Sequence, residues 1–276
     1  MSRCSLMIAA LLVSCGWPEH RFREPGDAAV DAVVEDTASL AAPTMCPPES
    51  ERAAPCDELR HFPDRWDVDG EGSEFCRQEA GKPATPMRRF TAKEAARVTP
   101  AGATPPEQFV VRAGLSAFGV HVFVQVLGDP RVLIDRDDPI RGDAVEIFLR
   151  GSHDRTLTGA LDLDEGHHLV LTPPTAAAEG VGARYLNGKR VGAVADEQWH
   201  SRRVRSGWEV ELHYPWTVLK NQPSPGMTMG FDIAFDVRDD PAGEAVHVVM
   251  HLEPVATCMD PACDDRTWCL AKAYVP

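Results

Sequence analysis

Several short stretches of the chain alternate between apolar and polar residues, and this pattern limits the fold more than any other feature. The alternation is clearest in Val120–Val126, Trp208–Tyr214 and Gly230–Val237. Successive side chains of a β-strand point to opposite faces, so each stretch is expected to bury one face only. Turn sequences such as Asn187-Gly188 separate the stretches. The pattern predicts an all-β, antiparallel β-sandwich of the jelly-roll kind over residues 60–276.

The first residues predict an exported protein that is held at a membrane by lipid. One positive charge, Arg3, precedes the apolar run Leu6–Val13, which is too short to span a bilayer. The run ends in Leu12-Val13-Ser14-Cys15, which resembles the lipobox of bacterial lipoproteins. The resemblance implies a signal peptide over residues 1–14 and lipidation of Cys15; an ordinary secretory signal with an incidental cysteine is the alternative.

The residues after the lipid site predict where the protein resides and how it is displayed. Gly16 follows Cys15, without an aspartate that retains a lipoprotein at an inner membrane, so we expect the outer membrane or the cell surface. Residues 15–59 are rich in Ala, Pro, Glu and Asp and have few aromatic residues, so they cannot bury much apolar surface. We interpret this segment as a tether.

The cysteines indicate a disulfide-bonded domain. Of the eight cysteines, Cys4 leaves with the signal peptide and Cys15 takes the lipid, and an oxidising compartment favours disulfides among the rest. The six that remain permit fifteen pairings, including Cys46 with Cys56 or either of them with the domain. A zinc site made by the last three cysteines is the alternative, although their spacing fits zinc motifs poorly. The disulfide candidates are Cys46, Cys56, Cys76, Cys258, Cys263 and Cys269.

The formal net charge of −14 argues against nucleic acid as a partner. A strongly acidic surface repels phosphate backbones, and no basic stripe offsets the charge. The expected partners are therefore the membrane, through the lipid, and a ligand of the folded domain.

Five segments, in order along the chain, resemble the family 9 carbohydrate-binding modules and the related DOMON domains. Gly142–Leu149 is similar to the family's "x-D-S-V-E-I-F-I/L" strand and is the most specific match. Together the five cover essentially the whole predicted domain. They are Asp67–Phe75, Phe109–Pro130, Gly142–Leu149, Gly207–Trp216 and Gly226–Asp239.

The resemblance implies a non-catalytic sandwich that binds carbohydrate. Glu146 matches a glutamate that accepts hydrogen bonds from sugar hydroxyls, and Asp143 either contacts the ligand or fixes the entry of its strand. The family's two stacking tryptophans are missing, because their places hold Ile140 and the stretch Ala256–Pro261. Sugar rings stack on aromatic faces, so a substitute platform is needed.

Two loop or strand-end tryptophans, Trp66 and Trp199, are the candidates for this platform, with packing over a sheet end as the alternative for each. The family frequently carries structural calcium, for which the aspartates at 135, 137, 138, 162, 164, 239 and 240 offer oxygen ligands. No other cofactor and no catalytic motif is found, so we expect a protein that is not an enzyme.

The sequence therefore predicts a surface lipoprotein with a carbohydrate-binding domain. A structural or protein-interaction domain with a degenerate sugar site is the first alternative, motivated by Ile140 and Cys258. A haem-binding domain is the second, because related sandwiches hold haem through Met and His, and His247 and His251 lie four residues apart.

Overall fold

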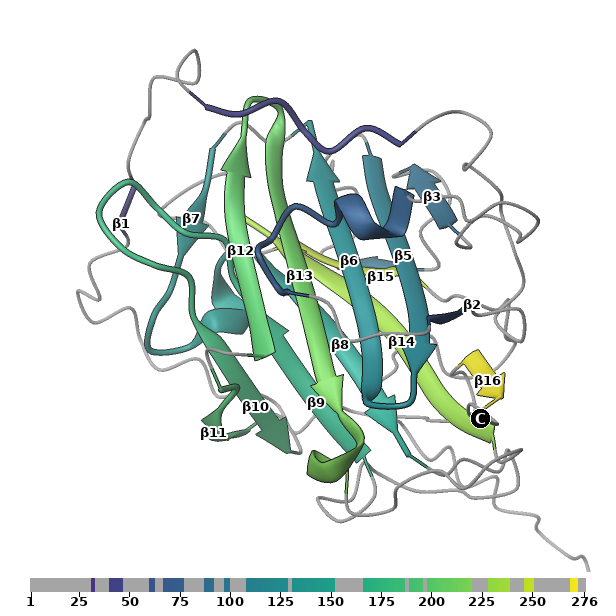
Figure 1. Cartoon of the computed structure of the whole chain (residues 1–276). Helices are drawn as coiled ribbons and strands as arrows, with labels where there is room; N and C mark the ends of the chain where they lie inside the picture. Colours follow the sequence, from purple (N-terminus) through teal and green to yellow (C-terminus); the bar gives the residue numbers. More distant parts are fainter. Residues whose placement is uncertain are drawn as a thin grey trace, which may run out of the picture.

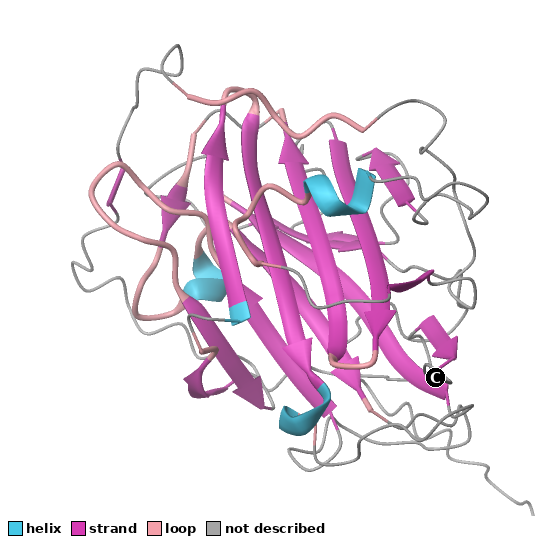
Figure 2. Cartoon of the chain, viewed as in Figure 1, coloured by secondary structure: helices cyan, strands magenta, loops and turns pink. Residues whose placement is uncertain are grey.

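The chain folds into two β-sheets that lie one in front of the other, as the alternating pattern predicts (Figure 1). Strands make up nearly all of the regular structure, with only short 3-10 helices between them (Figure 2). The antiparallel β-sandwich is therefore confirmed. The computed structural model describes residues 31–32, 40–46, 60–62, 67–76, 87–91, 97–99, 108–128, 131–151, 166–186, 189–195, 198–219, 228–238, 246–250 and 269–272.

The sheet nearer the viewer in Figure 1, called the front sheet below, has the strand order β12-β13-β6-β5-β2, and β3 also pairs with β5. All of its pairs are antiparallel except β2 with β5. Its strands are β2 (Arg60–Phe62), β3 (Met87–Thr91), β5 (Gln108–Ser116), β6 (Gly119–Leu127), β12 (Trp199–Val204) and β13 (Gly207–Pro215).

The other sheet, called the back sheet, has the order β11-β10-β9-β8-β14-β15-β4, and β16 also pairs with β14. A separate antiparallel pair joins β1 (Asp31–Ala32) to β7 (Leu133–Ile134). The strands of the back sheet are β4 (Arg97–Thr99), β8 (Ala144–Arg150), β9 (Gly166–Leu171), β10 (Gly182–Leu186), β11 (Lys189–Ala193), β14 (Thr228–Val237), β15 (Val246–Met250) and β16 (Cys269–Lys272).

The core lies between the sheets and consists of the apolar members of each alternation. The four valines of β6 face the interior together with Trp208, Val210, Leu212 and Tyr214 of β13. From the back sheet, alternate residues of β8, β9 and β14 meet them. Phe109 and Phe235 pack across the gap with ring centroids 4.2 Å apart. Period-two patterning therefore accounts for the core directly.

The outward-facing polar residues of the central strands are buried as well, which corrects the expectation that each strand buries one face only. Glu146 of β8 is 2% exposed, and Glu209 and Glu211 of β13 are 0% and 2% exposed. The reason is a further layer of chain outside the sheets: residues 40–46 and 67–76 cover the front sheet, and the 3-10 helix Pro139–Arg141 packs on the back sheet. Among the described residues, no helix has the length and apolarity to cross a membrane.

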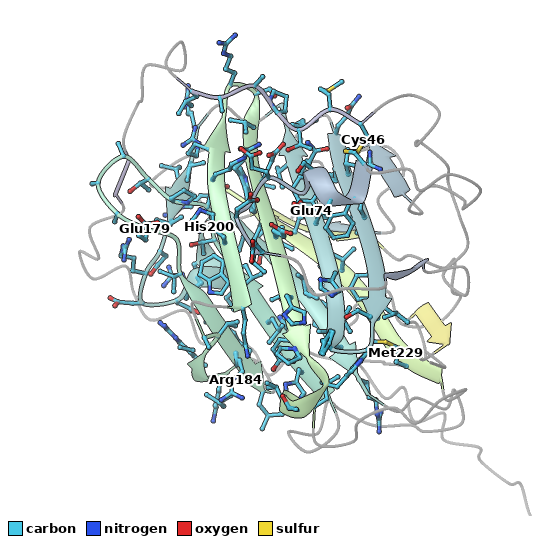
Figure 3. All side chains as sticks on the ribbon, in the orientation of Figure 1. Cys46, Glu74, Glu179, Arg184, His200 and Met229 are labelled. Atoms are coloured by element: carbon cyan, nitrogen blue, oxygen red, sulfur yellow. A yellow bond between two sulfur atoms is a disulfide. The ribbon has the colours of Figure 1, made fainter. Side chains whose placement is uncertain are left out.

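Residues 40–46, called the leading segment below, lie against the sandwich although they belong to the predicted tether. Ala41 forms a parallel bridge with Val204 of β12, and its carbonyl accepts a hydrogen bond from the Arg205 amide at 2.9 Å. Cys46 is joined to Cys76 by a disulfide. Cys46 is labelled in Figure 3 close to the 3-10 helix Ser73–Cys76, which ends at its partner. Residues 40–46 of the predicted tether are thus docked on the domain.

Candidate functional site

The outer face of the back sheet carries the glutamate that the sequence singles out. In β8 the interior takes Val145, Ile147 and Leu149, so Glu146 points outward by alternation. The register places it between Val170 of β9 and Ala234 of β14, in the middle of the sheet. Glu146 therefore faces away from the core, although its side chain is buried.

Glu146 lies in a cluster of aromatic and polar side chains contributed by neighbouring strands. Its Oε2 atom pairs with Nε2 of His168, which comes from β9. The His168 ring stacks on Phe148, with centroids 4.4 Å apart and planes 19° apart. On the other side the Tyr185 ring lies 5.5 Å from the His168 ring. A carboxylate acceptor thus contacts one member of a group of stacked rings, and carboxylates and aromatic rings are the two kinds of group that bind sugars.

Tyr185 is oriented by the loop that precedes β8. Its hydroxyl donates a hydrogen bond to Oδ1 of Asp138 at 3.0 Å. Burial and the negative charge of Asp138 raise the pKa of Tyr185 above its ordinary value, so the hydroxyl keeps its proton and remains a donor. Ile140, two residues after Asp138, packs on the apolar cluster that includes Tyr185. An aromatic side chain therefore does lie beside the position where the expected tryptophan is missing.

His168 and Tyr185 were not identified from the sequence. In the sequence, His168 comes two residues after the turn-type stretch Asp164-Glu165-Gly166, and Tyr185 comes two residues before Asn187-Gly188, so both resemble exposed loop residues. Only strand pairing shows that His168 lies opposite Phe148 and Tyr185 opposite His168. The alternation along β9 and β10 could have placed both side chains on the outer face. Only the register of the two strands shows that they meet there.

Asp143 has a structural role in the observed geometry. Its Oδ2 accepts a hydrogen bond from the Leu133 amide at 2.6 Å, and its Oδ1 accepts one from the Arg238 amide at 2.7 Å. The residue is fully buried. These bonds tie β7 and the end of β14 to the start of β8, which matches the interpretation that Asp143 fixes the entry of its strand.

The structure does not bring Trp199 to Glu146. Trp199 begins β12, is 8% exposed and belongs to the core between the sheets. Its indole lies against Gly182 of β10, where an added Cβ would be 2.6 Å from Nε1. Because Glu146 lies on the outer face of the same sheet as Gly182, the sheet separates the two residues, and the packing alternative describes Trp199. Trp66, the other candidate, lies outside the described residues.

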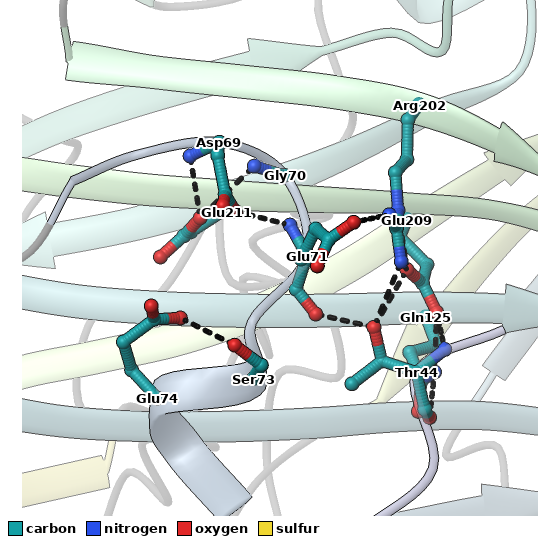
Figure 4. A network of polar contacts seen from close by, with 10 residues as sticks. All are labelled: Thr44, Asp69, Gly70, Glu71, Ser73, Glu74, Gln125, Arg202, Glu209 and Glu211. Carbon is teal, nitrogen blue, oxygen red and sulfur yellow. Dashed lines mark hydrogen bonds and ion pairs between the residues drawn. The ribbon is translucent and has the colours of Figure 1, made fainter.

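A second buried polar cluster lies on the outer face of the front sheet, under the leading segment and residues 67–76 (Figure 4). Glu209 accepts hydrogen bonds from the Thr44 amide at 2.6 Å and from Nε2 of Gln125 at 2.7 Å, and it forms an ion pair with Arg202 at 2.9 Å. Arg202 also pairs with Glu71. Glu209 thus joins the leading segment, β6 and β12 at one point.

Glu211, two residues further along β13, holds residues 67–76. Its Oε2 accepts hydrogen bonds from the amides of Asp69 and Gly70, both at 3.0 Å. Burial raises the pKa of Glu211 from its ordinary 4.5 to about 7; the two backbone hydrogen bonds oppose the increase, and the nearby charges of Glu74 and Asp69 add to it. The same motif residues that resemble the family's opening thus form a contact with the sheet.

The disulfide closes this arrangement. Cys46 and Cys76 are 4.9 Å apart at their Cα atoms, so the leading segment and residues 67–76 are covalently joined. This pairing is among those left open from the sequence, in which Cys46 or Cys56 bonds to the domain. Cys269 lies in β16. Cys15, Cys56, Cys258 and Cys263 lie outside the described residues.

Two of the described calcium candidates, Asp135 and Asp138, accept hydrogen bonds within the protein. Asp135 Oδ1 accepts hydrogen bonds from the amides of Asp137 and Asp138, at 3.1 and 2.9 Å, and Asp138 is engaged with Tyr185. In the part of the chain that the structure describes, no three or more His, Cys, Asp or Glu side chains are arranged to hold a metal ion. The aspartates at 162, 164, 239 and 240 lie outside it, as does His251, whereas His247 lies in β15 opposite Asp236.

Comparison with known proteins identifies the fold. No protein-family model matches the sequence, and no curated protein is significantly similar to it. Among solved structures, a family 9 carbohydrate-binding module from Caldicellulosiruptor kristjanssonii in complex with cellotriose has 16% identity and a TM-score of 0.52, covering 78% of this chain and 92% of that one. A family 9 module from the same organism in complex with glucose has 15% identity and a TM-score of 0.51, covering 78% and 94%. The domain therefore has a fold like that of the family 9 modules.

Proposed function

We propose that the protein is a surface-anchored lipoprotein whose sandwich binds carbohydrate without catalysis, at the outer face of the back sheet. The observation that carries the proposal is the cluster of Glu146, His168, Phe148 and Tyr185 on that face. The fold supports it, because the neighbours with this architecture were solved with cellotriose and with glucose.

In this proposal Glu146 accepts hydrogen bonds from sugar hydroxyls. A carboxylate can accept several hydrogen bonds, and the contact with His168 positions this one. Tyr185, fixed by Asp138, replaces the missing tryptophan as the ring beside the sugar. In these roles the groups accept hydrogen bonds from the sugar and pack against it, and no proton transfer or covalent bond is involved. The proposed function is therefore binding.

The lipid on Cys15 and the tether of residues 15–59 would hold this domain at the bacterial outer membrane or cell surface. Within the tether residues, Asp31–Ala32 pairs with β7 and the leading segment packs on the front sheet, so the tether contacts the sandwich at two places. Labelling cells with a radioactive fatty acid tests the anchor: the native chain should be labelled, and a Cys15→Ser chain should not.

Carbohydrate binding is tested by calorimetric titration of the Cys15→Ser chain with glucose, cello-oligosaccharides and a wider oligosaccharide panel. Glu146→Gln should weaken the binding of a responding sugar about tenfold or more, because hydrogen bonds to a charged group contribute about 1.5–3 kcal/mol. Glu179→Gln, which changes an exposed residue in the connection between β9 and β10, should leave the affinity for sugar unchanged. Absence of heat with every sugar at millimolar concentration would refute the proposal.

One observation favours the alternative of a structural or protein-interaction domain with a degenerate sugar site. Glu146 and His168 are 2% and 3% exposed, so the groups that would meet a sugar already contact each other. In this alternative His168 occupies the place of the ligand. Replacing His168 with alanine distinguishes the two proposals. The change should create or strengthen sugar binding if the imidazole fills the sugar site. It should weaken sugar binding if the imidazole positions Glu146.

A further inference from the structure

Two neighbouring glutamates of β13 hold the chain that covers the front sheet, and their surroundings differ in charge. Glu209 holds the leading segment through Thr44 and has a cation, Arg202, at 2.9 Å. Glu211 holds residues 67–76, called the strap below, only through the amides of Asp69 and Gly70. No described cation forms an ion pair with Glu211. Within the described part of the chain, the strap is therefore seated on a buried carboxylate that has no ion-pair partner.

The charges that shift the pKa of Glu211 are those of acidic residues, although basic groups also lie around it. In the register, Glu211 lies between Phe123 of β6 and His200 of β12, and Arg112 of β5 follows Phe123 in the same row. The strap adds acids from above, and their charges disfavour ionisation of Glu211. The titratable and charged groups around it are Asp69, Glu71 and Glu74 of the strap, Arg112 of β5, His121 of β6, His200 and Arg202 of β12, and Glu209 and His213 of β13.

The strap fits closely over the sheet. Gly72 has φ of +56°, and a Cβ at this position would lie 2.3 Å from the Phe123 ring, so the backbone runs directly over the ring. Phe75, which is fully buried, stacks on Phe123 with centroids 5.8 Å apart. The far end of the strap is held by the Cys46–Cys76 disulfide. Opening is therefore restricted to the end that contains Asp69 and Gly70.

We propose that residues 67–76 form a pH-sensitive strap, which is seated on the front sheet while Glu211 is protonated and lifts at its Asp69–Gly70 end when Glu211 ionises, with the Cys46–Cys76 disulfide as its hinge. When protonated, Glu211 still accepts the two amide hydrogen bonds through its carbonyl oxygen, and the charge repulsion from Asp69 and Glu74 disappears. When ionised, the buried carboxylate gains hydration if the strap lifts. Lifting breaks the two amide hydrogen bonds and exposes the Glu211 side chain to water.

The strap lies on the front sheet, whereas the proposed carbohydrate site lies on the back sheet. The pH-dependent opening of the strap therefore does not depend on the carbohydrate-binding proposal. The expected size follows from the pKa of Glu211, about 7 under the strap and 4.5 when hydrated. With these values the open fraction of the strap increases about tenfold between pH 6 and pH 8. The direction of the effect follows from the raised pKa. Because Glu211 binds its proton more tightly in the closed state, low pH favours closure of the strap.

The test is hydrogen–deuterium exchange of the disulfide-bonded Cys15→Ser chain at pH 6 and pH 8, with rates corrected for the intrinsic pH dependence of exchange. Peptides that cover the strap should lose protection about tenfold at pH 8, and peptides from β6 should not. Glu211→Gln should remove the difference. His200→Gln, which changes the exposed neighbour in the same row, should keep it.

A second variant keeps the test decisive if Glu211→Gln does not fold. Glu74→Gln removes one of the charges that raise the pKa of Glu211, so the ratio between pH 8 and pH 6 should fall below tenfold. The proposal is overturned if the strap's corrected protection is equal at both pH values. It is also overturned if His200→Gln abolishes the difference, because the titrating group would then be the imidazole.

Discussion

Replacing His167 with glutamine should make the domain less sensitive to acid than the native chain. His167 lies on the inner face of β9, is 9% exposed, and has its Nδ1 atom 2.6 Å from the Tyr214 hydroxyl. Among the described residues its Nε2 atom has no hydrogen-bond partner. Burial, and secondarily the positive charge of Arg184, lower the pKa of His167 from 6.5 to about 4. The native state therefore holds a neutral imidazole.

The sign and size of the effect follow from this shift. The unfolded chain binds a proton near pH 6.5 and the folded chain only near pH 4, so stability is lost as the pH falls through this window. The full shift corresponds to about 3 kcal/mol, and solvent screening of a group that is not fully enclosed reduces it to about 2 kcal/mol. Glutamine does not titrate, so the variant should not lose this contribution.

The assay is urea unfolding followed by tryptophan fluorescence, at intervals from pH 7.5 to pH 4. Glu211 titrates in the opposite direction, because its raised pKa makes the fold more stable as the pH falls from 7 to 4.5. Both chains should therefore carry Glu211→Gln, so that the His167 contribution is measured alone. If the His167→Gln change alters the free energy of unfolding by the same amount at pH 7.5 and at pH 4, the account of a buried neutral imidazole is wrong.

Two further predictions concern stability. Changing Cys46 and Cys76 together to serine should lower the free energy of unfolding by about 3.6 kcal/mol, the chain-entropy value for their separation of 30 residues, and a loss below about 1 kcal/mol in urea unfolding would contradict it. Gly207→Ala should destabilise the fold by about 3 kcal/mol, because Gly207 has φ of +152° and an added Cβ would lie 1.9 Å from the Val126 carbonyl oxygen. Gly192→Ala in β11, where the Cβ meets only the Arg184 side chain, is the control, and equal losses for the two changes would refute the argument.

Much of the fold could be predicted from residues that are close together in the chain. The alternations at Val120–Val126 and Gly230–Val237 lie in β6 and β14, and Gly142–Leu149 overlaps most of β8. The outward direction of Glu146 follows from the same period of two. These predictions succeeded because the two faces of a strand are encoded by alternate residues, whatever the strand pairs with.

The candidate site could be predicted only in part. Glu146 was identified, but its neighbours His168 and Tyr185 come from other strands, and Trp199 lies on the opposite side of the back sheet. A tryptophan at a strand end has the same local sequence whether it faces a ligand or a core. The difference lies in Gly182, whose missing side chain gives the indole its space.

The sequence by itself thus determined the class of fold, the residues of the core and the parity of each strand, because these depend on local periodicity. Only the tertiary structure decided which side chains meet. It selected the Cys46–Cys76 pairing, and it placed Thr44 on Glu209 and Asp69 on Glu211, across separations of 165 and 142 residues. It also buried the polar face of the front sheet that the alternation assigned to solvent, because residues 40–46 and 67–76 exclude water from it.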